Sequence, residues 1–106
     1  MTVFCLGSIN IDRVYRLPHL PQAGETLAAN NHSQGLGGKG INQTIAALRA
    51  GAQVVHIGAI GQNDAWIEGE LTRHGVTLDA IARVQAGTGH AFVAVDDVGE
   101  NQIIIA

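Results

Sequence analysis

The glycine-rich segment at residues 35–40, Gly-Leu-Gly-Gly-Lys-Gly, constrains the fold more than any other feature of the chain. Glycine adopts backbone conformations that other residues avoid, so this segment predicts a tight turn. Apolar residues follow at the helical spacing i, i+4 and i+7, at Ile41, Ile45 and Leu48. Gly51 then suits the C-terminal cap of a helix. The chain is therefore expected to pass directly from a glycine-rich turn into an amphipathic helix.

The elements around this helix indicate an α/β fold. Residues 3–6 form a short apolar run that ends at Gly7, and residues 54–60 form a near-continuous one. The second run predicts a strand buried on both faces. Residues 65–74 read as a second helix with Asp64 as its N-cap. Strands that alternate with helices in this way predict a parallel sheet covered by helices.

Two further regions predict β-structure of another kind. Residues 13–17 precede Pro18 and Pro21, so we expect at best an edge strand or a loop there. Residues 25–34 are polar and are read as a solvent-facing strand. The apolar runs 91–95 and 102–105 flank a polar, glycine-containing turn, which is the pattern of a β-hairpin.

Composition limits the function classes. The chain has 106 residues, of which 46% are hydrophobic and 14% charged, as expected for one domain with a core. Its net charge of −3 argues against nucleic acid or an anionic membrane as a partner. The single Cys5 fits a reducing cytoplasm, and the first residues resemble neither a signal peptide nor a transmembrane segment. Because the chain stops within an apolar run, we expect the front part of a larger fold.

The glycine-rich turn is also a candidate ligand site. Gly35, Gly37 and Gly40 satisfy the G-x-G-x-x-G pattern of dinucleotide-binding domains, but residues 29–34 before it are polar, where that fold needs a buried strand. A P-loop is excluded, because Gly40 stands where it needs serine or threonine. Lys39 is the only lysine of the chain and lies in this turn. A hinge with a solvated lysine and a ligand-binding turn both remain open.

Three amide and carboxylate side chains have the chemistry of a sugar site. Asn10 and Asp12 follow the first strand, and Asn42 lies in the first helical turn. Such groups can donate to and accept from vicinal hydroxyls, although asparagine and aspartate are also common in turns. The five histidines show no metal-ligand spacing, so no metal site is predicted, and His56 reads as a satisfied core residue.

Residues 37–44, Gly-Gly-Lys-Gly-Ile-Asn-Gln-Thr, together with Gly51 and Gly61, resemble the first signature of the PfkB carbohydrate kinases. Residues 7–12, Gly-Ser-Ile-Asn-Ile-Asp, resemble the opening sugar-binding motif of the ribokinase branch, and residues 24–26 and 99–101 are similar to further family landmarks. Ile41 and Thr44 depart from the signature, since alanine is usual at both positions.

The resemblance implies the N-terminal part of a three-layer α/β/α core with a small β-sheet lid, whose strands lie at about 13–17, 25–36 and 89–106. It also implies that one group of residues binds the sugar hydroxyls and that two residues of the lid provide an apolar lining for the sugar ring. The binding group is Asn10, Asp12, Gly38, Lys39 and Asn42; the hinge of the lid is Gly37 and Gly38; the lining is Ala91 and Val93.

The function implied is the sugar-binding portion of an ATP-dependent kinase that phosphorylates a pentose such as ribose. The family's catalytic aspartate and nucleotide site lie further downstream, so we expect no catalytic residue in these 106 residues and no activity from them alone. ATP and Mg²⁺ would serve the full-length parent and would not be bound here. A homodimer or higher oligomer through the lid strands is also implied. The alternatives are a non-catalytic sugar-binding or lid-type dimerisation module, and a dinucleotide-binding domain.

Overall fold

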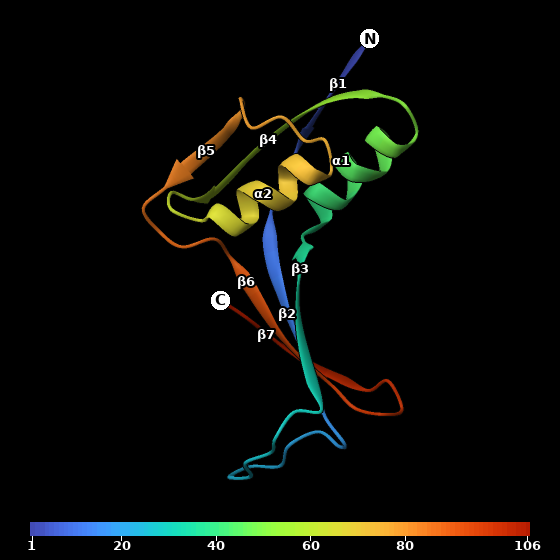
Figure 1. The fold of residues 1–106 in the computed structure, drawn as a ribbon, viewed down its shortest axis with the longest axis vertical. Helices are drawn as coiled ribbons and strands as arrows, with labels where there is room; N and C mark the ends of the chain where they lie inside the picture. The colour runs from blue at the N-terminus through green and yellow to red at the C-terminus, as the bar shows by residue number, and fades with distance from the viewer. The chain divides into compact units, whose positions relative to one another are not determined.

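A computed structural model describes residues 1–106, which separate into two compact units. The core unit contains residues 1–11 and 36–89, and the sheet unit contains residues 12–35 and 90–106. Figure 1 labels the elements. They are β1 (Thr2–Leu6), β2 (Asn10–Arg16), β3 (Asn31–Gly37), α1 (Lys39–Arg49), β4 (Gln53–Gly61), α2 (Ala65–Arg73), β5 (Ile81–Val84), β6 (His90–Val95) and β7 (Asn101–Ile105).

The core unit is built on a three-stranded sheet in the order β1-β4-β5. Both strand pairs are parallel, with Phe4 opposite Val55 and Ala59 opposite Ala82. A helix connects β4 to β5, as parallel pairing requires, because a short turn cannot return the chain to the same end of a sheet. The predicted alternation of parallel strands and helices is confirmed.

The helix boundaries follow the local chemistry that the sequence indicated. After α1 the chain reverses at Gly51, whose φ of 92° lies in the left-handed region that glycine adopts without strain. At the start of α2 the Asp64 side chain accepts a hydrogen bond from the backbone N–H of Ile67 at 3.2 Å. This bond satisfies one of the donors that a helix N-terminus leaves free.

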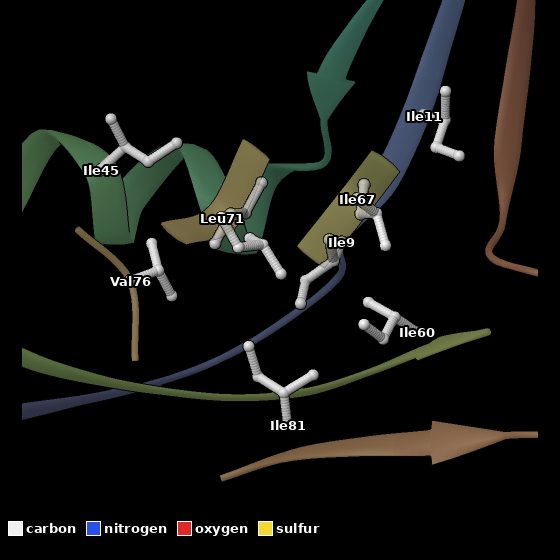
Figure 2. Packing of buried hydrophobic residues seen from close by; sticks show 9 residues of the cluster. Ile9, Ile11, Ile45, Ile60, Ile67, Leu71, Val76 and Ile81 are labelled. Atoms are coloured by element: carbon white, nitrogen blue, oxygen red, sulfur yellow. The ribbon is translucent and has the colours of Figure 1, made fainter. Parts of the chain in front are cut away.

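Both helices bury their apolar faces against the same side of the sheet. Ile41 and Ile45 of α1 and Ile67 and Leu71 of α2 pack with Ile60 of β4 in one cluster (Figure 2). The remaining members of that cluster are Ile9, Ile11, Val76 and Ile81. The hydrophobic core of the unit therefore lies between the two helices and one face of the sheet.

The opposite face of this sheet is uncovered, so the prediction of a strand buried on both faces was wrong for β4. Ile60 is 1% exposed, whereas Ile57 is 39% exposed and Phe4 and Leu6 of the neighbouring strand are 68% and 78% exposed. The cause is the two-residue period of a strand, which turns alternate side chains away from the helices. Ile60 projects toward the helices, whereas Ile57 lies on the uncovered face.

The sheet unit contains most of a four-stranded sheet, whose strand order is β3-β2-β6-β7. The segment expected at best as an edge strand or a loop is an interior strand, β2. Pro18 and Pro21 do not interrupt it, because β2 ends at Arg16 before either proline. The segment read as a strand over residues 25–34 becomes one only at Asn31, where β3 begins.

The predicted hairpin is confirmed as β6 and β7, which pair antiparallel with Val93 opposite Ile103. The Asp96 carboxylate shapes its turn by accepting hydrogen bonds from the backbone N–H groups of Val98 and Glu100 at 3.1 and 2.9 Å. On one face of this sheet the ring of Tyr15 stacks on Phe92, with centroids 4.9 Å apart, and on His32 at 5.7 Å.

Candidate functional site

The start of α1 packs directly on the turn that follows β1. Gly38, the N-cap of α1, has a φ of 107°, and a Cβ atom there would lie 2.7 Å from the carbonyl oxygen of Ser8. That same oxygen accepts a hydrogen bond from the backbone N–H of Ile41 at 3.0 Å. Only glycine satisfies both the backbone conformation and the space at this position.

A second close approach locks the same two segments together. A Cβ atom on Gly7 would lie 2.5 Å from the Cα of Gly40, and one on Gly40 would lie 2.4 Å from the Cα of Gly7. The glycines of the predicted signature therefore let two backbones touch. These contacts explain Gly38 and Gly40 without any reference to a ligand, whereas a Cβ atom on Gly35 would meet nothing within 4 Å.

Two polar side chains of the first turn of α1 remain accessible. Gly38 offers no side-chain cap, and the N–H of Ile41 in this first turn already donates to the Ser8 carbonyl. Lys39 and Asn42 are both exposed, and Asn10 is half-buried at the start of β2. The core unit thus carries Asn10, Gly37, Gly38, Lys39 and Asn42 of the predicted sugar site, around the contact between the turn and α1.

The other three predicted residues belong to the sheet unit. Asp12 is half-buried in β2, and Ala91 and Val93 are half-buried in β6. Ala91 and Val93 are alternate residues of one strand, so they project to the same side of the sheet. Phe92 between them lies on the other side with Tyr15. The two apolar side chains predicted to line a sugar therefore share a face.

The glycine-rich segment lacks the setting of a dinucleotide site. Residues 35–37 of the segment belong to β3 and not to the predicted tight turn, so the chain passes from strand to helix through Gly38. β3 pairs in the four-stranded sheet with β2 and not in the parallel sheet of the core unit. A dinucleotide fold instead needs the glycines directly after a buried parallel strand. This removes the dinucleotide-binding alternative.

A hollow of about 300 Å³ lies elsewhere in the core unit, at the carboxyl ends of β4 and β5. Asp64 and Thr88 form part of its wall, and the Thr88 hydroxyl donates to Asp64 Oδ2 at 2.9 Å. None of the predicted sugar-binding residues lines it. This hollow was not predicted, because the polar groups around it come from separate turns.

The match to a known family extends over nearly the whole chain. Residues 2–106 match the model of the pfkB family carbohydrate kinases. The chain belongs to this family. The predicted resemblance is thereby confirmed, as is the ribokinase-like fold.

Ribokinases from distant organisms are similar to this pfkB family member. The chain is 39% identical to the ribokinase of Haemophilus influenzae over 108 residues, which cover 99% of this chain and 35% of that protein. It is 33% identical to the ribokinase of Schizosaccharomyces pombe, covering 100% of this chain and 36% of that one. The chain thus spans about a third of the length of these relatives.

Solved structures show the same likeness. A ribokinase from Cryptococcus neoformans in complex with ADP superposes with a TM-score of 0.82 at 38% identity, covering 99% of this chain and 34% of that one. The ribokinase of Arabidopsis thaliana complexed with ribose and ATP superposes with a TM-score of 0.82 at 30% identity, covering 99% and 35%.

One departure from the family signature has a local explanation. Thr44 is fully buried, and its hydroxyl lies 2.7 Å from Nδ1 of His56. His56 is also fully buried, and its Nε2 lies 3.0 Å from the carbonyl oxygen of Gly7. The prediction that His56 is a satisfied core residue is confirmed. Sequence reasoning missed the pairing with Thr44, because the two residues lie on different elements.

Two further observations concern the whole chain. Neither helix is long and apolar enough to cross a membrane. No three histidine, cysteine, aspartate or glutamate side chains lie together in a group that could hold a metal ion.

Proposed function

We propose that this chain is the N-terminal, sugar-binding portion of an ATP-dependent kinase that phosphorylates a pentose such as ribose. The observation that carries the proposal is the packing of the α1 start on the Gly7–Ser8 turn. That packing brings Asn10, Lys39 and Asn42 to the same part of the core unit. The ribokinase from Arabidopsis thaliana, similar over 99% of this chain, is described with ribose and ATP bound.

The proposed work of these residues is to bind and orient the sugar. Asp12 accepts hydrogen bonds from hydroxyls, whereas Asn10 and Asn42 both donate and accept. Lys39 donates from its ammonium group, and Gly38 allows the sugar to approach the backbone. Ala91 and Val93 cover the apolar edge of the ring from the lid, the role we propose for the sheet unit, which closes about Gly37 and Gly38.

The phosphoryl transfer itself is assigned to residues beyond this segment. In the proposed reaction the γ-phosphoryl group of ATP moves to a primary hydroxyl of the sugar, and a downstream carboxylate accepts the hydroxyl proton. ATP and Mg²⁺ are proposed to be bound by the full-length parent, outside these 106 residues. We therefore expect the 106-residue chain alone to convert no D-ribose with ATP above the rate of a protein-free control.

The uncovered face of the core sheet supports the proposal that these residues are one portion of a larger kinase. Phe4, Leu6 and Ile57 expose apolar surface on the face opposite the helices. Large apolar patches mark contact surfaces in soluble proteins. In the proposed kinase the third layer of the α/β/α core covers this face.

Assembly and location complete the proposal. All five residues of β7, the last strand in the sheet order, are exposed, including Ile103, Ile104 and Ile105. An exposed edge strand readily pairs with another chain, so we propose a homodimer or higher oligomer through the lid strands, in the cytoplasm. This edge also favours the second candidate function, a non-catalytic sugar-binding or dimerisation module.

A chimera tests the proposal against that alternative. It joins residues 1–106 to the part of Haemophilus influenzae ribokinase that follows the matched segment. If the segment is the sugar-binding portion of a kinase, the chimera phosphorylates D-ribose with ATP. A folded chimera that binds ATP and leaves D-ribose unphosphorylated favours the non-catalytic module.

A further inference from the structure

Two consecutive hydrogen bonds, one buried and one partly buried, link α1, β4 and the turn after β1. Thr44 Oγ1 lies 2.7 Å from His56 Nδ1, and His56 Nε2 lies 3.0 Å from the carbonyl oxygen of Gly7. Both side chains are 0% exposed. No other side chain of the core unit bridges these three elements through hydrogen bonds.

The chemistry of the partners determines which atom donates and which accepts in each of these two hydrogen bonds. A backbone carbonyl can only accept, so His56 Nε2 carries a proton and donates it to Gly7. In the neutral ring Nδ1 is then an acceptor, and the Thr44 hydroxyl donates to it. The Gly7 carbonyl thus selects the tautomer with the proton on Nε2, and the Thr44 hydroxyl satisfies the Nδ1 acceptor that this tautomer leaves.

The Gly7 carbonyl belongs to the turn on which the candidate site is built. A Cβ on Gly7 would collide with Gly40, and the carbonyl of the next residue, Ser8, accepts from the N–H of Ile41. A Cβ on Gly58 would lie 2.9 Å from the Gly7 oxygen and 3.1 Å from His56 Nε2, so β4 also approaches the turn closely. A shift of Gly7 therefore moves the turn relative to the first residues of α1.

We infer that Thr44 and His56 are positioning residues that hold the Gly7–Ser8 turn against the start of α1. They thereby fix the spacing between Asn10, which follows the turn, and Asn42, which lies in the first turn of α1. The inference rests on the proposed function in one respect, since these are the groups assigned to the sugar. Neither Thr44 nor His56 needs to touch the ligand.

The first test uses the unmodified 106-residue chain. Nitrogen NMR of the His56 ring is expected to show the proton on Nε2, protected from exchange with water. A proton on Nδ1, or an Nε2 proton that exchanges as fast as that of the exposed His19, overturns the inference.

The second test separates positioning from general stability. Amide hydrogen exchange is compared for Ile41, which donates to Ser8, and Ile45, which lies further along the same helix. Thr44→Val removes the hydroxyl and leaves Nδ1 without a donor. We expect it to speed exchange at Ile41 about tenfold relative to Ile45. A purely structural role speeds both amides equally, and that result contradicts the inference.

Matched variants complete this test. Thr44→Ser keeps the hydroxyl and is expected to restore the exchange ratio of the unmodified chain. Thr72→Val removes a hydroxyl from an exposed position on α2 and is expected to leave the ratio unchanged. If Thr44→Val does not fold, the double variant Thr44→Ala/His56→Phe replaces the pair by apolar groups, and the same selective exchange at Ile41 is expected.

Titration with D-ribose distinguishes this inference from the proposed function. If the unmodified chain binds D-ribose, Thr44→Val is expected to weaken that binding and Thr44→Ser to restore it. If the unmodified chain shows no response to D-ribose while Thr44→Val selectively speeds exchange at Ile41, the sugar-binding assignment of this chain loses its support and the positioning of the turn stands.

Discussion

Gly7 and Gly40 meet backbone to backbone, so closely that a Cβ atom on Gly7 would lie 2.5 Å from the Cα of Gly40. The contact joins the turn after β1 to the first residues of α1. It accounts by packing alone for Gly40 of the family signature and for Gly7 of the opening motif. The sugar-binding role proposed for this region depends on that contact, because it brings Asn10 and Asn42 to the same part of the core unit.

We predict that Gly40→Ala destabilises the chain. The added methyl group would overlap backbone atoms of Gly7 and Ser8, which cannot move as a side chain can. Overpacking of this kind costs about 1–3 kcal/mol, measured as a fall in the free energy of unfolding in urea. Gly69→Ala in α2 is the matched control, since a Cβ there meets nothing within 4 Å. Equal effects of the two substitutions would contradict the packing account.

The sugar assignment is tested by Asp12→Ala and Asn42→Ala in the chimera. Each removes hydrogen bonds to sugar hydroxyls, so we predict a KM for D-ribose raised about tenfold or more for each variant, with the fold retained. Asp79→Ala, at an exposed position outside the candidate site, is the control. Unchanged kinetics in both Asp12→Ala and Asn42→Ala would show that these residues do not bind the substrate.

The Gly24–Thr26 landmark gives a prediction about pH. Glu25 accepts a hydrogen bond from the backbone N–H of Gln22 at 3.0 Å, and its other carboxylate oxygen lies 3.0 Å from His19 Nε2. The Gln22 bond, followed by the His19 contact, holds the pKa of the Glu25 carboxyl below its usual range.

Because this pKa is lowered on folding, the bond stabilises the loop above the ordinary pKa of glutamate, and this stabilisation is lost as the pH falls through the lowered value. The Gln22 amide resonance should therefore shift in acid with the titration of Glu25. In Glu25→Gln that shift should disappear. A Glu25 carboxyl that titrates above its usual range would refute the prediction.

For assembly, we predict that Ile104→Lys shifts the oligomer toward monomer. Ile104 is 65% exposed on β7, and a lysine there places charge on the strand edge proposed to pair between copies. Val98→Lys is the control, because Val98 lies in the hairpin turn and is 84% exposed. Sedimentation of the 106-residue chain at low micromolar concentration is the measurement. A concentration-independent monomer before any substitution would exclude the proposed interface.

Local chemistry made the core elements predictable from sequence. Gly51 and Asp64 mark helix ends because their roles depend on neighbouring backbone atoms alone. The sidedness of β4 was not predictable in this way. Ile57 and Ile60 look alike in an apolar run, and only the position of both helices on one face separates them.

The residues of the candidate site likewise separate into those that local sequence indicates and those that it does not. Gly38, Lys39 and Asn42 were predicted because they lie close together in the sequence and form part of a signature. Ala91 and Val93 were indicated by family resemblance, since two apolar residues in a strand carry no binding chemistry of their own. The hydrogen bond between Thr44 and His56 was not predicted, because it joins residues from different elements.

The central claim is that residues 1–106 supply the sugar-binding portion of a kinase, and the ATP-dependent phosphorylation of D-ribose by the chimera tests it most directly. The control is the same stretch of Haemophilus influenzae ribokinase without residues 1–106. The account predicts saturable formation of phosphorylated ribose by the chimera and none by the control. A chimera that folds and binds ATP, yet forms no more phosphorylated ribose than the control, would contradict it.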